Sequence, residues 1–236
     1  MKRTPCQMLV LFLLTFCVSW TGCGGGSSGG FSSDSFDFDV QNSDFVVTND
    51  FSFEIDVVDH TRLRLTAINS TVTIVGEPNR GSVLISGEKR VGSNTIEDAE
   101  QQLLELKVDL QVLTEEIFLR TMQPQQSAGR NYVVNYTIII PEDLEVFVDS
   151  VNGTVTVDAV SSSVDVNLVN GTIELRIPQE ISAIFSAHTA NGTIDLRNLQ
   201  LKDEMRFSNS LQGRFGDGEN SISLDVANGN INVSGL

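Results

Sequence analysis

Apolar and polar residues alternate along most of the chain, with the period of two that is typical of β-strands with one buried face. Every second residue from Val164 to Leu168 is apolar, for example, and the alternation resumes from Ile173. The pattern predicts an all-β protein. The strands expected before the repeats cover residues 51–58, 62–67, 71–75, 82–86, 107–113, 116–122 and 132–140.

One segment has a helical pattern instead. Thr95 stands three residues before Asp98, as in a capping box, and apolar residues follow at helical spacing at Ala99, Leu103 and Leu106. The pattern predicts one short helix over residues 96–106.

A short motif recurs in the second half of the chain, in which an Asn-Gly pair is followed by alternating residues. The glycines at 153, 171, 192, 213 and 229 are 18, 21, 21 and 16 residues apart, an average of 19. We interpret the pairs as tight turns, because glycine adopts the positive φ that such turns require. The turn residues are Asn152, Gly153, Asn170, Gly171, Asn191, Gly192, Asn228 and Gly229, with a degenerate copy at Gly213 and a weaker one over 69–74.

Two architectures are compatible with this repeat. Asn-Gly between apolar runs is a strong β-hairpin signal. Alternatively, each unit is one coil of a parallel β-helix, in which like residues stack. We favour a parallel β-helix, or solenoid, of about five coils of ~19 residues, preceded by an irregular β region with one short helix. Its first ladder would contain Val155, Ile173, Ile194 and Ile231, and its second Val157, Leu175, Leu196 and Val233. The segment 209–213 would be a widened turn of one coil.

The N-terminus has the features of an export signal. A positive start, Met1-Lys2-Arg3, precedes an apolar run over residues 8–20, which is too short for a usual membrane span. Thr21-Gly22-Cys23 then resembles a bacterial lipobox, which implies cleavage before Cys23 and its modification with lipid, palmitate included. The alternative is an ordinary signal peptide in which Cys23 is incidental.

This interpretation divides the chain into four parts. We expect a lipoprotein signal peptide over residues 1–22, the lipidated Cys23 with a Gly/Ser tether over 23–33, an N-terminal β region over 34–143 and the repeat region over 144–236. Gly24 after the cysteine resembles outer-membrane sorting. The expected location is therefore the cell envelope of a bacterium, at the outer membrane or the cell surface.

Composition and charge argue against several classes of function. The chain has 236 residues and a formal net charge of −16, which argues against binding to nucleic acid. All three cysteines lie within the first 23 residues, so the folded part has none for a disulfide. There are two histidines, His60 and His188, and the sequence lacks a nucleophile elbow, a zinc-ligand cluster and a phosphate-binding loop. We expect no catalytic residue, no metal site and no cofactor.

Two acidic segments, 34–39 and 216–220, carry oxygen ligands of the kind that calcium prefers. Neither matches an EF-hand loop or a calcium β-roll repeat. We therefore interpret them as a solvated strand face and a turn.

The chain resembles the adhesin-like proteins with β-strand repeats known as domain of unknown function 4097. The resemblance rests on the Asn-Gly-Thr repeats, the Tyr-Thr-Ile-Ile-Ile-Pro run over 136–141 that enters them, and the closing segments 216–218 and 228–231. It implies a β-helix-like fold and a cell-surface location, and it supplies no catalytic residues.

The expected function is that of a lipid-anchored, surface-exposed, adhesin-like protein that is not an enzyme. Its partners would be the membrane, through the lipid, and a cell-surface protein or polysaccharide. One alternative is a carbohydrate-active β-helix enzyme or a calcium-dependent glycan binder, since β-helices also host carbohydrate-active enzymes. A weaker alternative is a partner in envelope-stress signalling.

Overall fold

The computed structural model describes residues 43–236, which form thirteen β-strands and one α-helix. The expected signal peptide (1–22), Cys23, the tether (23–33) and the acidic segment 34–39 lie outside the described residues. The all-β architecture with one short helix is confirmed. The strands are β1 (Phe45–Asp56), β2 (Arg62–Glu77), β3 (Ser82–Ser93), β4 (Lys107–Val112), β5 (Glu116–Met122), β6 (Asn131–Pro141), β7 (Glu145–Asp158), β8 (Val164–Ile177), β9 (Ala183–Asn191), β10 (Ile194–Arg197), β11 (Lys202–Arg206), β12 (Ser210–Phe215) and β13 (Asn220–Gly235).

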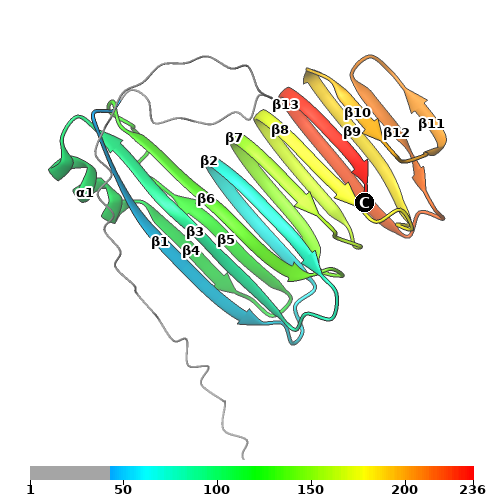
Figure 1. Cartoon of the computed structure of the whole chain (residues 1–236), viewed down its shortest axis with the longest axis horizontal. Helices are drawn as coiled ribbons and strands as arrows, with labels where there is room; N and C mark the ends of the chain where they lie inside the picture. Colours follow the sequence, from blue (N-terminus) through cyan, green and yellow to red (C-terminus); the bar gives the residue numbers. More distant parts are fainter. Residues whose placement is uncertain (1–42) are drawn as a thin grey trace, which may run out of the picture.

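The helix α1 (Ile96–Glu105) begins where the sequence predicts. Thr95 is its N-cap, with an extended backbone, and its side-chain oxygen accepts a hydrogen bond from the backbone N–H of Asp98 at 3.2 Å. The helix packs against β1 and β3 at one end of the sheet (Figure 1). Among the described residues, no helix has the length and apolar character needed to cross a bilayer.

The strands do not stack in the order in which they occur in the chain. Along the sheet the order is β1-β3-β6-β2-β7-β8-β13-β9-β12-β11, so the last strand of the chain lies between β8 and β9. Figure 1 shows this as the red β13 between the yellow β8 and the gold β9. The two predicted ladders are present, but their members do not stack in the order of the sequence. Ile231 lies between Ile173 and Ile194 and pairs with both.

The Asn-Gly pairs are not hairpin turns. Three of them lie inside the long strands β7, β8 and β13, and these strands pair in parallel. The weak upstream copy belongs to the same stack, since Asn69 pairs with Asn152. The sheet as a whole is mixed and does not close. A solenoid of about five coils is therefore not confirmed.

Each long strand divides at its Asn-Gly position into two halves with different neighbours. The first half of β2 pairs with β5, and its second half pairs with β6. Likewise the first half of β13 pairs with β9 and its second half with β10. We call the strand halves before these positions, together with β4, β5, β9, β11 and β12, the first half-sheet. The halves after them, together with β1, β3, β6 and β10, form the second half-sheet.

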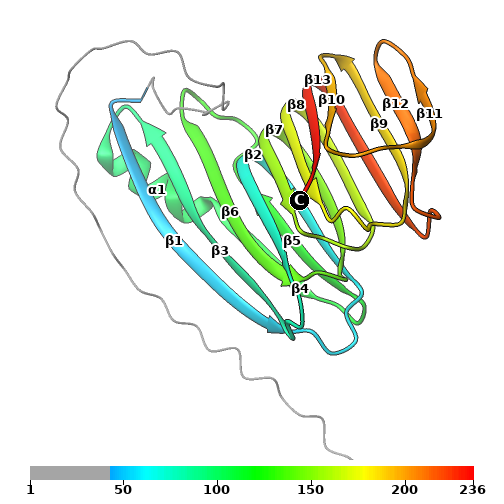
Figure 2. The same cartoon turned by 45° about the vertical axis from the view of Figure 1, so that its right-hand side comes forward.

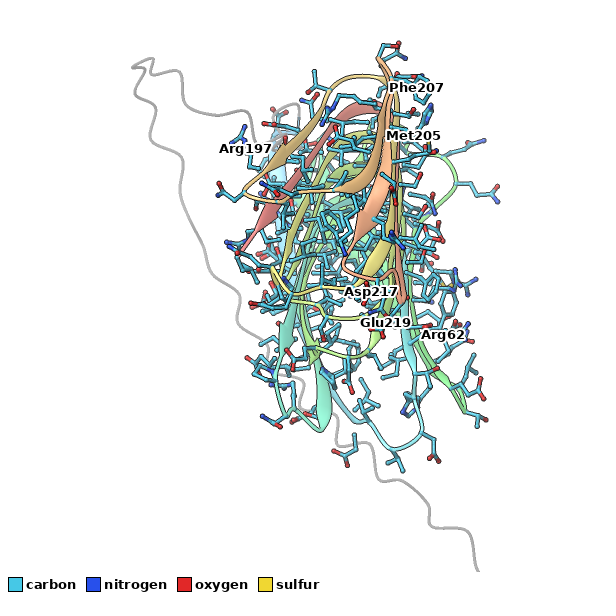
Figure 3. All side chains as sticks on the ribbon, turned by 90° about the vertical axis from the view of Figure 1, so that its right-hand side faces the viewer. Arg62, Arg197, Met205, Phe207, Asp217 and Glu219 are labelled. Atoms are coloured by element: carbon cyan, nitrogen blue, oxygen red, sulfur yellow. The ribbon has the colours of Figure 1, made fainter. Side chains whose placement is uncertain are left out.

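The two half-sheets enclose one hydrophobic core. In β7 the buried residues are even-numbered up to Ser150 and odd-numbered from Gly153 onward, so the alternation shifts by one residue between the two halves. Tyr136 of the second half-sheet shares a 2.7 Å hydrogen bond with Thr121 of the first, and burial raises the pKa of Tyr136 to about 12. Viewed from the end of the stack, Arg62 and Arg197 project on opposite sides (Figure 3).

The prediction for residues 209–213 was wrong. Gly213 is not part of a coil turn but lies in β12, which pairs antiparallel with β9. Leu211 and Phe215 are buried there, and Phe215 contacts Phe185 edge to face with ring centroids 5.3 Å apart. Because the chain reverses after β10, Met205 and Phe207 end up in the outermost hairpin, 53% and 65% exposed. Figure 2 shows this hairpin, β11 and β12, at the far end of the stack.

Candidate interaction surfaces

A continuous row of asparagine side chains runs across the stack where the half-sheets meet. Each amide nitrogen donates to the amide oxygen of the next asparagine, at 2.7 Å from Asn152 to Asn69, 2.8 Å from Asn170 to Asn152, 2.9 Å from Asn228 to Asn170 and 2.9 Å from Asn191 to Asn228. At one end Asn69 donates to the backbone carbonyl of Tyr132 at 3.0 Å. We call these five residues the asparagine ladder. It fixes the register of the parallel strands and is a structural element.

The glycines beside the ladder are required by close approach of the backbone. Gly171 has φ +142°, and a Cβ atom there would lie 1.7 Å from the carbonyl oxygen of Gly153. Gly153 and Gly229 have similar values of φ and similar contacts. Gly192 does not have a positive φ, yet a Cβ atom there would lie 1.7 Å from the carbonyl oxygen of Gly229. Only glycine fits at these positions.

The outer surface of the first half-sheet is charged. Arg64 lies over the ring of Phe147 at 4.9 Å from its centroid and forms ion pairs with Glu116 at 3.3 Å and Asp149 at 3.7 Å. On the neighbouring strands, Asn167 donates to two carboxylates and Asp225 pairs with His188 at 3.3 Å. We call this surface the charged face. Its members are Arg62, Arg64, Glu116, Phe147, Asp149, Asp165, Asn167, His188 and Asp225.

The carboxylates of the charged face influence one another. Burial raises the pKa of Asp165, and the negative charges of Asp149 and Asp225 raise it further. The hydrogen bond from Asn167 and the charge of Arg64 act in the opposite direction. Among residues 43–236, no group of three or more His, Cys, Asp or Glu side chains has an arrangement that could hold a metal ion.

On the outer surface of the second half-sheet, threonines lie side by side over β6, β2 and β7, with the exposed Glu174 of β8 next to Thr156. Thr73 lies beside Thr137 on one side and Thr156 on the other, and Thr71 lies beside Thr154. Their chain neighbours Val72 and Val155 are fully buried. We call the five residues Thr71, Thr73, Thr137, Thr154 and Thr156 the threonine face.

The basic side chains near the C-terminal end are each paired with a carboxylate. These residues are scattered along the sequence, which argues against a carbohydrate-active site. Lys202 lies 3.8 Å from Asp217, and Arg214 lies 3.0 Å from Asp203. The remaining pairs are Arg176 with Asp158, Arg197 with Asp195 and Arg206 with Glu204. The five basic residues are spread over the four strands β8, β10, β11 and β12.

The acidic turn at 216–220 is organised by a serine. The hydroxyl oxygen of Ser182 accepts hydrogen bonds from the backbone N–H groups of Asp217, Gly218 and Glu219 at 3.1, 3.0 and 3.3 Å. The side chain of Asp217 is 93% exposed, and the turn lies at the end of the stack that faces the viewer in Figure 3. Beside the turn lies an open hollow of about 520 Å³, lined by Gln179, Asn198, Leu199, Gln200, Phe215 and Gly216.

Sequence reasoning found the ladder residues and three acidic residues of the charged face, but not the threonine face. The predicted residues Asn152, Asn170, Asn191 and Asn228 are brought into one row, and Cys23 lies outside the described residues. The threonine face could have been found, because Thr-Val-Thr occurs at both 71–73 and 154–156. Alternation in the sequence places Asp149, Asp165 and Asp225 of the charged face outward, but the face as a whole comes from six strands whose order is not the order of the sequence.

Comparison with known proteins gives the following. A family model described as Toastrack DUF4097 matches residues 86–234. No curated protein matches the chain. The crystal structure of a candidate cell adhesion protein from Clostridium sporogenes is similar in fold, with a TM-score of 0.50 and 15% identity, over 80% of this chain and 100% of that one. A candidate adhesin from Bacteroides fragilis aligns over 83% of this chain and 99% of its own, with a TM-score of 0.23 and 10% identity.

Proposed function

The chain belongs to the Toastrack DUF4097 family, and from that premise we propose that it is a lipid-anchored, adhesin-like protein of a bacterial cell surface that binds other molecules without catalysing a reaction. The observation that carries the proposal is the pair of broad outer surfaces, the charged face and the threonine face, on opposite sides of one core. Flat surfaces of this kind suit contact with extended partners better than the enclosure of a small substrate.

The rigidity of the fold supports a binding role. The strands share one core to which both half-sheets contribute, and the asparagine ladder links β2, β7, β8, β13 and β9. A rigid scaffold loses little conformational entropy when its surface binds a partner. The similarity of fold to a candidate cell adhesion protein points in the same direction.

The N-terminal sequence supports the anchor. The lipobox-like Thr21-Gly22-Cys23 follows an apolar run of export-signal length, and a Gly/Ser-rich segment separates Cys23 from the folded part. Acyl chains would hold the protein at a membrane that its net charge of −16 does not favour.

Membrane fractionation and intact mass test the proposal together. The wild-type chain should sediment with membranes and carry a mass increase of lipid size on Cys23. Cys23→Ser should remain unmodified and leave the membrane fraction or stay uncleaved. A mature wild-type chain without lipid would refute the anchor.

A further inference from the structure

The hydroxyl groups of the threonine face are free to bind. None of Thr71, Thr73, Thr137, Thr154 and Thr156 uses its side chain in a hydrogen bond within residues 43–236, a range over which many other polar side chains do. Thr71 and Thr137 are exposed, and the other three are partly exposed. Their orientation is fixed, because the alternating residues Val72, Ile74, Val155 and Val157 are fully buried.

Strand propensity does not explain this surface. Threonine is common in strands because its branched side chain suits the pleated sheet. However, the first halves of the same strands present different residues to solvent, such as Arg64 in β2 and Phe147 and Asp149 in β7. Adjoining threonines therefore cluster on one side of the molecule, whereas Thr66 on the other side lies between Arg120 and Asp149.

The charge of the threonine face indicates the kind of partner. The chain has a net charge of −16, yet none of the five residues is charged. The nearest charge beyond β7 in the row of Thr73 and Thr156 is Glu174 of β8, which is exposed and forms no ion pair within residues 43–236. An anionic polymer would be repelled by the whole protein, whereas an uncharged ligand would not.

The spacing of the hydroxyls suits a long, hydroxylated chain. Neighbouring strands are about 4.8 Å apart, and alternate residues along a strand are about 6.7 Å apart. Each threonine hydroxyl can both donate and accept. Polysaccharides also carry hydroxyls that donate and accept, repeated along their length. We propose that the threonine face binds neutral, hydroxyl-rich polysaccharide chains without a metal ion, an inference that rests on the proposed adhesin-like function and names its ligand class.

Retention on insoluble polysaccharides tests this directly. The full-length chain, purified in detergent, would be mixed with particulate β-glucan, mannan and chitin as neutral probes, and with alginate and polygalacturonate gels as anionic ones. We expect retention on at least one neutral probe, unchanged by a metal chelator, and none on the anionic gels. The double variant Thr73→Val/Thr156→Val should bind about tenfold more weakly, because valine keeps the shape and strand preference of threonine but removes the hydroxyl.

Thr66→Val is the matched control. Thr66 also lies in β2, but in the first half-sheet. Removing its hydroxyl group should therefore leave binding to the polysaccharide within twofold of wild type. All variants should keep the wild-type melting temperature. Binding that the double variant retains in full, binding abolished by the chelator, or retention on anionic gels alone would overturn the inference. Failure to bind any neutral probe would also overturn the inference. Membrane fractionation tests the proposed function separately, so a lipid anchor found by that experiment would not rescue it.

Discussion

The side-chain amide of Asn170 donates to the side-chain oxygen of Asn152 at 2.8 Å, although the two residues are 18 positions apart in the chain. The same relationship links Asn228 to Asn170 across 58 positions. One residue type thus aligns parallel strands that the sequence separates by very different distances.

Removing Asn170 from the middle of the asparagine ladder should destabilise the protein. Asn170→Ala removes two hydrogen bonds, one to Asn152 and one from Asn228, each of which contributes about 0.5–1.5 kcal/mol, so the expected cost is about 1–2 kcal/mol. Asn191→Ala, at the exposed end of the ladder, breaks one hydrogen bond and should cost less than about 1 kcal/mol. Urea unfolding of both variants measures the difference. Equal losses would show that the ladder does not act as a unit.

A side chain at Gly171 should be poorly tolerated. Gly171→Ala places a Cβ atom against the carbonyl oxygen of Gly153 at a φ that other residues rarely adopt. The backbone conformation alone costs about 1–3 kcal/mol, and the collision adds to this. Gly81→Ala is the control, because a Cβ atom there meets nothing within 4 Å. Denaturant melts should show a large loss for the first variant and a change below about 1 kcal/mol for the second. Similar stabilities would contradict the close stacking of β7 and β8.

The hydrogen bond between Tyr136 and Thr121 should contribute to the free energy of unfolding by linking the two half-sheets. Both residues are buried, so Thr121→Val leaves the tyrosine hydroxyl without its partner, at an expected cost of about 1–3 kcal/mol. Tyr136→Phe should cost a similar amount, and the double variant clearly less than the sum of the two. A double-mutant cycle from urea melts measures this coupling. Strict additivity would mean that the hydrogen bond does not connect the two layers.

Acid should weaken the attachment of α1 through Asp98. Arg130 donates two hydrogen bonds to this carboxylate, at 2.6 and 2.7 Å, and these bonds together with one from Ser93 lower the pKa of Asp98 to about 2 from its usual 3.8. A lowered folded-state pKa means that the ionised form stabilises the fold above the unfolded pKa. This stability should be lost as the pH falls from about 4 to 2.

Melting temperatures of wild type and Asp98→Asn against pH test this prediction. The gap between the two proteins should be constant above pH 5 and should close towards pH 2. Asp50→Asn changes an exposed carboxylate that forms no ion pair within residues 43–236, so it should have little effect at any pH. A gap that does not change with pH would contradict the role of Asp98.

The spacing of apolar residues along the chain predicted most of the strands and the helix. Alternation located the strands before the repeats, although the two strands expected over 62–67 and 71–75 are the single strand β2, and the spacing after Thr95 identified α1. The members of the ladders through Val155 and Val157 were also predicted, because like residues stack in a parallel sheet. The strands and the helix depend only on residues near one another in sequence, and the membership of the ladders follows from the repetition of one short motif.

The order of the stack could not be predicted in the same way. A repeat indicates that its copies stack, but not that β13 inserts between β8 and β9. Gly213 resembled another copy only by its spacing, whereas packing of Phe215 on Phe185 places its strand antiparallel to β9. The order also decides which outward residues lie side by side, so the composition of the two outer faces became visible only in the structure.

Labelling of intact cells tests the central claim, exposure at the cell surface, most directly. The side chain of Lys202 in β11 is 59% exposed and therefore accessible to an amine reagent that does not cross membranes. If the protein is a lipid-anchored surface protein, peptide mass spectrometry should find Lys202 labelled to the same extent in intact and in lysed cells. Labelling that occurs only after lysis would contradict the account.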